Sequence, residues 1–228
     1  MRRINFLLLA LGVLAACRRN VDPVSQGRAY FIGYGCNSCH RVGNSGGAYG
    51  PDLTYMGFRA TREWLNLYLK DPRAWKSNTP MPNFHLTDQA RSRIADYLFS
   101  LKGRDFSATG KPWDRKDILG DPVKRGGVIY ERVGCASCHG RDGKGGYPNN
   151  NVTGGQIPAL IRTAEGYSKE EVVARIRNGK KSDKADLNGP DPMVLMPGWG
   201  EVLTSDEIDA LVAYLYSLKP YAAPGERW

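Results

Sequence analysis

The sequence has few of the residues from which most metal and catalytic sites are built. Among its 228 residues there are three His, five Cys and five Met. Acidic residues form no paired-carboxylate motif, and no Gly-rich phosphate loop is present. Alternation typical of strands is nearly absent. An apolar fraction of 41% and a charged fraction of 24% exclude intrinsic disorder and a multi-span membrane protein.

Acidic residues are also outnumbered, with 32 Lys and Arg against 23 Asp and Glu. The excess is concentrated in residues 18–110, which have 13 basic and 7 acidic residues, whereas residues 111–228 have 17 and 16. Complementary charge mainly raises association rates. We therefore expect the first half to meet an acidic partner or an anionic lipid surface, and the second half to contact a different partner. A role in solubility alone is the alternative.

The N-terminal residues have the pattern of a secretory signal peptide. A short basic start is followed by an apolar run over 4–16, too short for the ~20 residues of a spanning helix but typical of a signal peptide. Leu14-Ala15-Ala16-Cys17 resembles the lipobox of bacterial lipoproteins, in which the Cys becomes the lipid-carrying N-terminus. We expect removal of residues 1–16 and a protein exported to the periplasmic side, lipid-anchored to a membrane through Cys17. An ordinary signal peptide cut nearby is the alternative.

The remainder of the chain is duplicated. Residues 26–40 align without a gap on 125–139, and residues 86–102 resemble 203–219. A period near 100 residues is too long for a solenoid repeat and indicates two homologous domains. The predicted organisation is domain 1 over 22–103, a linker over 104–120, domain 2 over 121–219 and a tail over 220–228.

Helix signals predict an all-α fold for both domains. Short helices are expected before residues 36 and 135. Thr61 is a predicted N-cap for a helix over 62–70, and capping boxes begin at Ser168 and Thr204. Domains of this size have little core of their own, so we expect each to be completed by a bound group.

Four of the five cysteines lie in two C-x-x-C-H motifs, Cys36/Cys39/His40 and Cys135/Cys138/His139. In an exported chain this spacing indicates covalent c-type haem, because the two thiols reach both porphyrin vinyl groups and the next His ligates the iron. A zinc ribbon needs pairs about 15–20 residues apart, and a thioredoxin-like pair needs a βαβ context; structural disulfides are a third alternative. We predict two covalently bound haem c groups.

Each half resembles class I cytochrome c in its order of a Gly-containing helix, C-x-x-C-H, a Pro loop, Met-Pro and a closing helix with an aromatic residue. The resemblance covers nearly the whole exported chain, as a tandem dihaem cytochrome c with one small helical bundle around each haem. It implies that Gly27 faces Tyr97, and Gly126 faces Tyr214, where the first and last helices of each domain cross.

The resemblance also implies which groups surround the iron. The carbonyls of Pro51 and Pro158 are expected to bind the second ring nitrogen of His40 and His139, which orients each ring and improves it as a ligand.

The sixth ligands are expected to be Met81, in Pro-Met-Pro, and Met196, in Leu-Met-Pro. Thioether ligation suits haem iron and raises its reduction potential. Met193 is an alternative to Met196, and His85 an alternative to Met81. Met56 comes too soon after the first motif and is interpreted as core.

Two haems with both axial positions filled can exchange electrons but have no open site for a substrate. We expect a non-enzymatic electron carrier between respiratory or photosynthetic redox proteins, with a membrane-bound donor complex and a terminal oxidase or reductase as acceptor. No nucleic acid or small-molecule substrate is expected. The alternatives are a dihaem peroxidase, a thiosulfate dehydrogenase with an axial Cys, or a fixed cytochrome subunit of a membrane complex.

Overall fold

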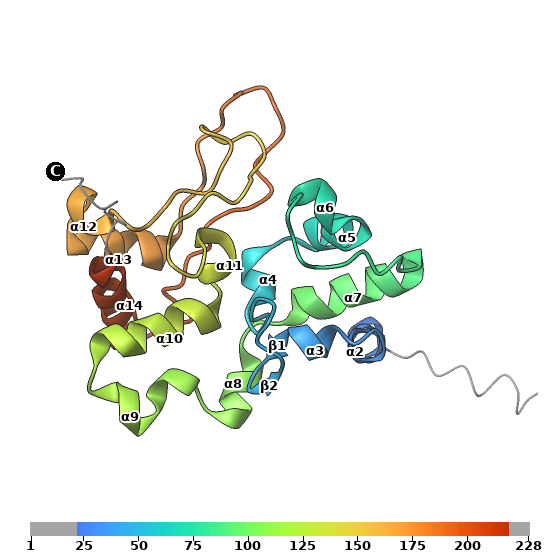
Figure 1. Ribbon diagram of the computed structural model, residues 1–228, viewed down its shortest axis with the longest axis horizontal. Coiled ribbons are helices and arrows are strands. Elements are labelled where there is room, and N and C mark those ends of the chain that lie inside the picture. Colours follow the sequence, from blue (N-terminus) through green and yellow to red (C-terminus); the bar gives the residue numbers. More distant parts are fainter. Residues whose placement is uncertain (1–21, 219–228) are drawn as a thin grey trace, which may run out of the picture.

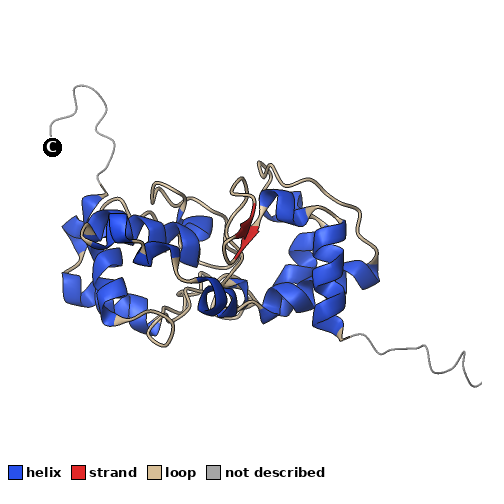
Figure 2. Ribbon diagram, turned by 90° about the horizontal axis from the view of Figure 1, so that it is seen from below, coloured by secondary structure: helices blue, strands red, loops and turns tan. Residues whose placement is uncertain are grey.

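The computed structural model describes residues 22–218 (Figure 1). The predicted signal peptide, the predicted lipidation site Cys17 and the tail over 220–228 lie outside this range. The described chain is mainly helical. It also contains a short antiparallel hairpin of two strands with two residues each, β1 (Arg41–Val42) and β2 (Ser45–Gly46). Its helices gather in two groups with this hairpin between them (Figure 2). The all-α prediction is confirmed.

The first group of helices, here the first bundle, precedes residue 101 and carries the first C-x-x-C-H motif. Its members are α2 (Pro23–Gly33), α3 (Cys36–Cys39), α4 (Met56–Arg59), α5 (Arg62–Lys70), α6 (Pro72–Trp75) and α7 (Asp88–Ser100). Thr61 caps α5 by accepting from the backbone N–H of Trp64 at 3.1 Å, as predicted. Such a cap contributes about 1 kcal/mol.

The second group, the second bundle, follows residue 121. Its members are α10 (Pro122–Val133), α11 (Ala136–His139), α12 (Thr163–Gly166), α13 (Lys169–Asn178) and α14 (Ser205–Ser217). Both predicted capping boxes are present, at Ser168 before α13 and at Thr204 before α14. Both bundles begin alike, with an Asp N-cap and Pro in the first turn of α2 and α10.

The first bundle is built on a close crossing of α2 and α7 at Gly27. A Cβ atom at this position would lie 1.9 Å from the carbonyl oxygen of Arg93 and 2.7 Å from Cβ of Tyr97. No side chain fits there, so the two helix backbones touch. The predicted pairing of Gly27 with Tyr97 is confirmed.

The second bundle repeats this crossing between α10 and α14. A Cβ atom at Gly126 would lie 2.0 Å from the carbonyl oxygen of Ala210 and 2.7 Å from Cβ of Tyr214. The ring of Tyr214 also packs on that of Tyr130, with ring centroids 5.1 Å apart. The two halves therefore share their central helix pair as well as their motifs.

The segment between the bundles is packed against them. It forms α8 (Arg104–Thr109), the 3₁₀ helix η1 (Pro112–Asp114) and α9 (Lys116–Leu119). Phe106 is 2% exposed and Trp113 is fully buried in the core of the second bundle. The indole N–H of Trp113 donates to the carboxylate of Glu207 at 2.6 Å. The predicted linker thus connects the halves as a folded element.

The hydrophobic core of the second bundle, here the second core, also includes residues from the first half of the chain. Trp199, in the segment before α14, is 4% exposed. Its ring lies against those of Tyr55 and Phe58, at centroid distances of 5.9 and 6.0 Å. Tyr55 belongs to this core although it precedes α4. Burial of such aromatic surface contributes on the order of 2 kcal/mol per ring, so the two bundles are held in fixed contact.

The extra length of the second half lies in two long loops, which follow α11 and α13 (Figure 1). Three consecutive Asn side chains tie them together. Their amide groups donate to backbone carbonyls of the later loop: Asn149 to Val194 at 2.9 Å, Asn150 to Asp191 at 3.1 Å, and Asn151 to Asp186 at 2.9 Å. Within residues 22–218, no helix has the length and apolar character needed to cross a membrane.

The crossing yields a stability prediction. Gly27→Ala should lower the free energy of unfolding by about 1–3 kcal/mol, because the added methyl group overlaps the backbone of α7. Gly33→Ala, in the same helix, is the matched control, since a Cβ there meets nothing within 4 Å and alanine favours helix by about 0.5–1 kcal/mol. Denaturant unfolding measures both. A wild-type midpoint for Gly27→Ala would contradict the close crossing.

Candidate haem sites

Each C-x-x-C-H motif forms a helical turn directly after the first helix of its bundle. Gly35 (φ 73°) precedes α3, and Gly134 (φ 101°) precedes the corresponding turn in the second half. This left-handed backbone favours glycine and separates each motif from the preceding helix, and the first cysteine of each motif packs against the core of its bundle. Cysteines three residues apart then lie on the same face of the turn.

The four motif cysteines are free thiols and form no disulfide. Burial raises the pKa of Cys36 and raises the pKa of Cys135 to about 12. A redox-active C-x-x-C pair needs a lowered thiol pKa, and the βαβ context is also missing from the described residues. These observations argue against the disulfide and thioredoxin-like alternatives.

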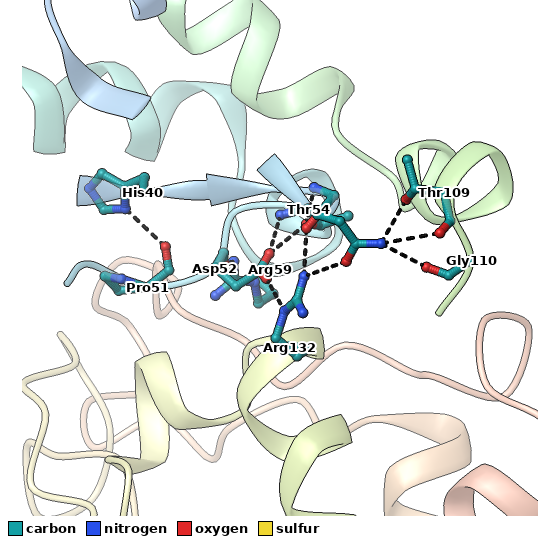
Figure 3. A network of polar contacts seen from close by, with 10 residues as sticks. His40, Pro51, Asp52, Thr54, Arg59, Thr109, Gly110 and Arg132 are labelled. Atoms are coloured by element: carbon teal, nitrogen blue, oxygen red, sulfur yellow. Dashed lines mark hydrogen bonds and ion pairs between the residues drawn. The ribbon is translucent and has the colours of Figure 1, made fainter. Parts of the chain in front are cut away.

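The two motif histidines are held in the same way. In the first site, Nδ1 of His40 donates to the carbonyl oxygen of Pro51 at 2.9 Å (Figure 3). In the second, Nδ1 of His139 donates to the carbonyl oxygen of Pro158, also at 2.9 Å. Because Nδ1 carries the proton, Nε2 has the free lone pair that a metal requires. Both predicted hydrogen bonds are present.

Backbone contacts fix these proline loops against the motifs. The N–H of Gly50 donates to the carbonyl of Cys39, and the N–H of Gly145 donates to that of His139, both at 2.8 Å. A Cβ atom at Gly50 would lie 2.6 Å from Cε1 of His40. The imidazole of His40 therefore lies directly on the backbone of the loop that accepts its hydrogen bond.

Burial keeps both imidazoles neutral. Desolvation lowers the pKa of His40 and of His139, and the carbonyls of Pro51 and Pro158 only partly oppose this effect by favouring the charged form. Each histidine therefore carries one ring proton near neutral pH. This is the protonation state of an iron-ligating imidazole.

Two of the candidate methionines pack against a bundle core, and Met193 does not. Met81 is half-buried against the core of the first bundle, and Met196 against the core of the second. The backbone carbonyl of Met196 accepts from Lys180 N–H at 3.0 Å. Met193 is half-buried, and its N–H donates to the side chain of Asn150 at 2.8 Å. Packing therefore favours Met196 over Met193.

The two remaining candidates agree with their sequence interpretation. Met56 is 8% exposed and belongs to the core of the first bundle. His85 is exposed and has a φ of 48°. An exposed imidazole on a strained turn is a poor replacement for the half-buried thioether of Met81.

These residues fit covalent haem. Each half offers a free thiol pair, a neutral imidazole with its Nδ1 proton engaged, and a thioether against its own core. In addition, Nε of Arg59 and Nε1 of Trp64 are buried donors without an acceptor among residues 22–218. Haem c would bring two carboxylates and a large apolar ring to these surroundings, and it would supply one-electron iron chemistry.

Comparison with known proteins agrees with this geometry. The cytochrome c family model matches residues 24–102 and 123–219, most of the chain. The chain belongs to the cytochrome c family. Membership implies covalent haem c and electron transfer as its chemistry.

Relatives of this cytochrome include both small carriers and oxidase subunits. It is 31% identical to cytochrome c6 of Euglena gracilis over 96 residues, 40% of this chain and 88% of that protein. It is 30% identical to the cbb3-type cytochrome c oxidase subunit FixP of Azorhizobium caulinodans over 129 residues, 56% of this chain and 34% of that subunit. With cytochrome c oxidase subunit 2 of Alkalihalophilus pseudofirmus the identity is 32% over 87 residues, 34% of this chain and 25% of that subunit.

The cytochrome therefore spans about a third of FixP and a quarter of the oxidase subunit 2. No solved structure matches the chain.

Sequence reasoning missed a group of buried polar residues beside the first site. Asp52 is 9% exposed, Thr54 is fully buried and Arg59 is 7% exposed. All three follow Pro51 within eight residues. Their charge and polarity resemble those of an ordinary solvated loop, so the sequence contains no signal of their burial.

The ligand assignment can be tested by spectroscopy. Met81→Ala and Met196→Ala should each remove about half of the sulfur-to-iron charge-transfer band and lower one haem's reduction potential, because thioether ligation raises that potential. His85→Ala and Met193→Ala are the matched controls and should retain the band. Loss of band intensity in Met193→Ala would show that Met196 is wrongly assigned. An unchanged band in Met81→Ala, with an altered haem spectrum in His85→Ala, would show that His85 replaces Met81.

Proposed function

We propose that this cytochrome carries two haem c groups, each with His/Met ligation, and passes single electrons between redox proteins. The observation that carries the proposal is the repeated site. In both halves a proline carbonyl 2.9 Å from Nδ1 orients the motif histidine, and a half-buried methionine packs against the same bundle. Two separate matches to the family model support a count of two.

A carrier role follows from the ligand set. The proposed ligands of the first haem are His40 and Met81, and those of the second are His139 and Met196. With both axial positions occupied, the iron has no open site for peroxide or another substrate. A dihaem peroxidase would need such a site. A thiosulfate dehydrogenase would need an axial Cys, whereas the four described cysteines all lie in the C-x-x-C-H motifs.

A second candidate function is that of a fixed subunit in a membrane-bound oxidase. The observation favouring it is that two of the relatives are named as cytochrome c oxidase subunits. Co-purification from detergent-solubilised membranes separates the two roles. A fixed subunit remains with an oxidase complex through chromatography, and a mobile carrier does not.

The haem count is tested by removing one attachment site at a time. Wild-type protein should contain two haems per chain by pyridine haemochrome assay and show two one-electron steps in a redox titration. Cys135→Ser/Cys138→Ser should retain one haem, and Cys36→Ser/Cys39→Ser the other. One haem per chain in the wild type, or a high-spin haem that turns over peroxide, would overturn the proposal.

We further propose export to the periplasmic side and attachment to the membrane through a lipid on Cys17. The lipobox-like residues 14–17 support this. The proposed partners are a membrane-bound donor complex and a terminal oxidase or reductase. The basic excess of residues 18–110 supports docking of the first half to an acidic surface.

The anchor is tested by fractionation. Wild-type protein should sediment with membranes and be released by detergent but not by high salt, because salt screens surface charge without extracting a lipid. Cys17→Ser should remain unprocessed or become soluble. Wild-type protein in the soluble fraction with an unmodified N-terminus would show that no lipid is attached.

A further inference from the structure

Arg59, the last residue of α4, reaches from the first half of the chain into the second. Its side chain lies beside Asp52 in Figure 3. Nη2 donates to the backbone carbonyl of Asp52, and Nη1 donates to the carbonyl of Gly134 at 3.3 Å and to the hydroxyl of Ser137. The residue is 7% exposed. One guanidinium therefore joins a loop of each half.

Arg132, in α10 of the second bundle, makes the reverse connection. Its Nε donates to the Asp52 carboxylate at 2.7 Å, and Nη2 donates to the carbonyl of Gly43 and to the side chain of Asn44 (Figure 3). The side chains of Arg132 and Asp52 are 12% and 5% exposed. Each half thus inserts one arginine into the other.

The position of Arg59 relative to the haem sites is specific. Asp52 directly follows Pro51, whose carbonyl holds His40. Ser137 lies between the two motif cysteines of the second half, and Gly134 precedes them. A Cβ atom at Gly134 would lie 2.5 Å from Cζ of Arg59, so the guanidinium lies flat against the backbone that leads into the second motif.

The protein side chains buried between the two halves carry an excess of positive charge. The two buried cations are Arg59 and Arg132, and Asp52 neutralises one of them. A third arginine, Arg141, is exposed and donates to the carbonyl of Ala48 at 3.1 Å. Glu131, the one acidic residue of α10, is half-buried, and none of the hydrogen bonds or ion pairs described for Arg59 and Arg132 involves its carboxylate. The remaining cation is buried next to the second motif, where low polarity strengthens its field and salt screens it little.

A buried cation beside a haem favours the reduced state, because reduction removes one positive charge from the iron. Burial and local charge are among the means by which a protein sets haem potential. We propose that Arg59 of the first half is a positioning residue for the second haem site and raises the reduction potential of the haem held by Cys135, Cys138 and His139. This inference rests on the proposed function, which places a haem on that motif.

The test compares Arg59→Met with Arg59→Lys in the full-length haem protein. Methionine keeps most of the side-chain length and removes the charge. Lysine keeps the charge but lacks the planar, forked N–H donors of the guanidinium. Arg59→Met should lower the reduction equilibrium constant of the second haem about tenfold, which is 59 mV for one electron. Arg59→Lys should retain most of the wild-type potential. The titration step whose potential falls in Met196→Ala is the step that belongs to the second haem.

Arg62→Met is the matched control. It removes the same charge from the same half, but Arg62 pairs with Asp96 inside the first bundle and its side chain is 38% exposed. The second haem should not respond to it. The shift in Arg59→Met should also persist at high salt, because a buried charge is poorly screened. Arg59→Gln, which keeps an amide donor, is a second uncharged variant if the methionine variant does not fold.

Three results would overturn the inference: an unchanged second potential in the uncharged variants, an equal fall in Arg62→Met, or an equal fall in Arg59→Lys. Wild-type protein without haem on the second motif would instead overturn the proposed function itself. Two attached haems with no response to Arg59 would leave the proposed function standing and remove only this inference.

Discussion

The contact between helix backbones at Gly27 and Gly126 is the constraint on which both halves depend. At these two positions the first and last helices of a bundle approach until a methyl group would overlap a carbonyl. The end of the first helix is thereby fixed, and the cysteine turn that follows it is fixed as well. The proline loop then needs only a few hydrogen bonds to bring its carbonyl to the histidine.

The two histidine sites have the same geometry although the loops around them differ in length. In the first site Pro51 lies 11 positions after His40, and in the second Pro158 lies 19 positions after His139. Both donor–acceptor distances are nevertheless 2.9 Å. The longer loop is stabilised by its asparagine side chains, which satisfy backbone carbonyls of the neighbouring loop. Loop length can therefore vary while the ligand orientation is retained.

Local signals in the sequence predicted much of this structure. The caps at Thr61, Ser168 and Thr204 act within four residues, and the C-x-x-C-H spacing specifies its own turn. The roles of Pro51 and Gly27 came from the family resemblance. The connection between the halves could not be read in this way. Arg59 and Ser137 are 78 residues apart, and Trp113 is buried in a segment that was predicted only as a linker.

The aromatic contact of Trp199 with Tyr55 and Phe58 has a consequence for assembly of the chain. Synthesis begins at the N-terminus, and domains generally fold in that order. Tyr55 meets Phe106 within the first 110 residues, but the ring faces that Tyr55 and Phe58 turn to Trp199 lack this contact until about 140 residues later. During that interval the newly made protein exposes an apolar surface. The segment before α14 therefore completes an apolar contact begun in the first half, and a chain truncated ahead of it would expose the ring faces that Trp199 covers.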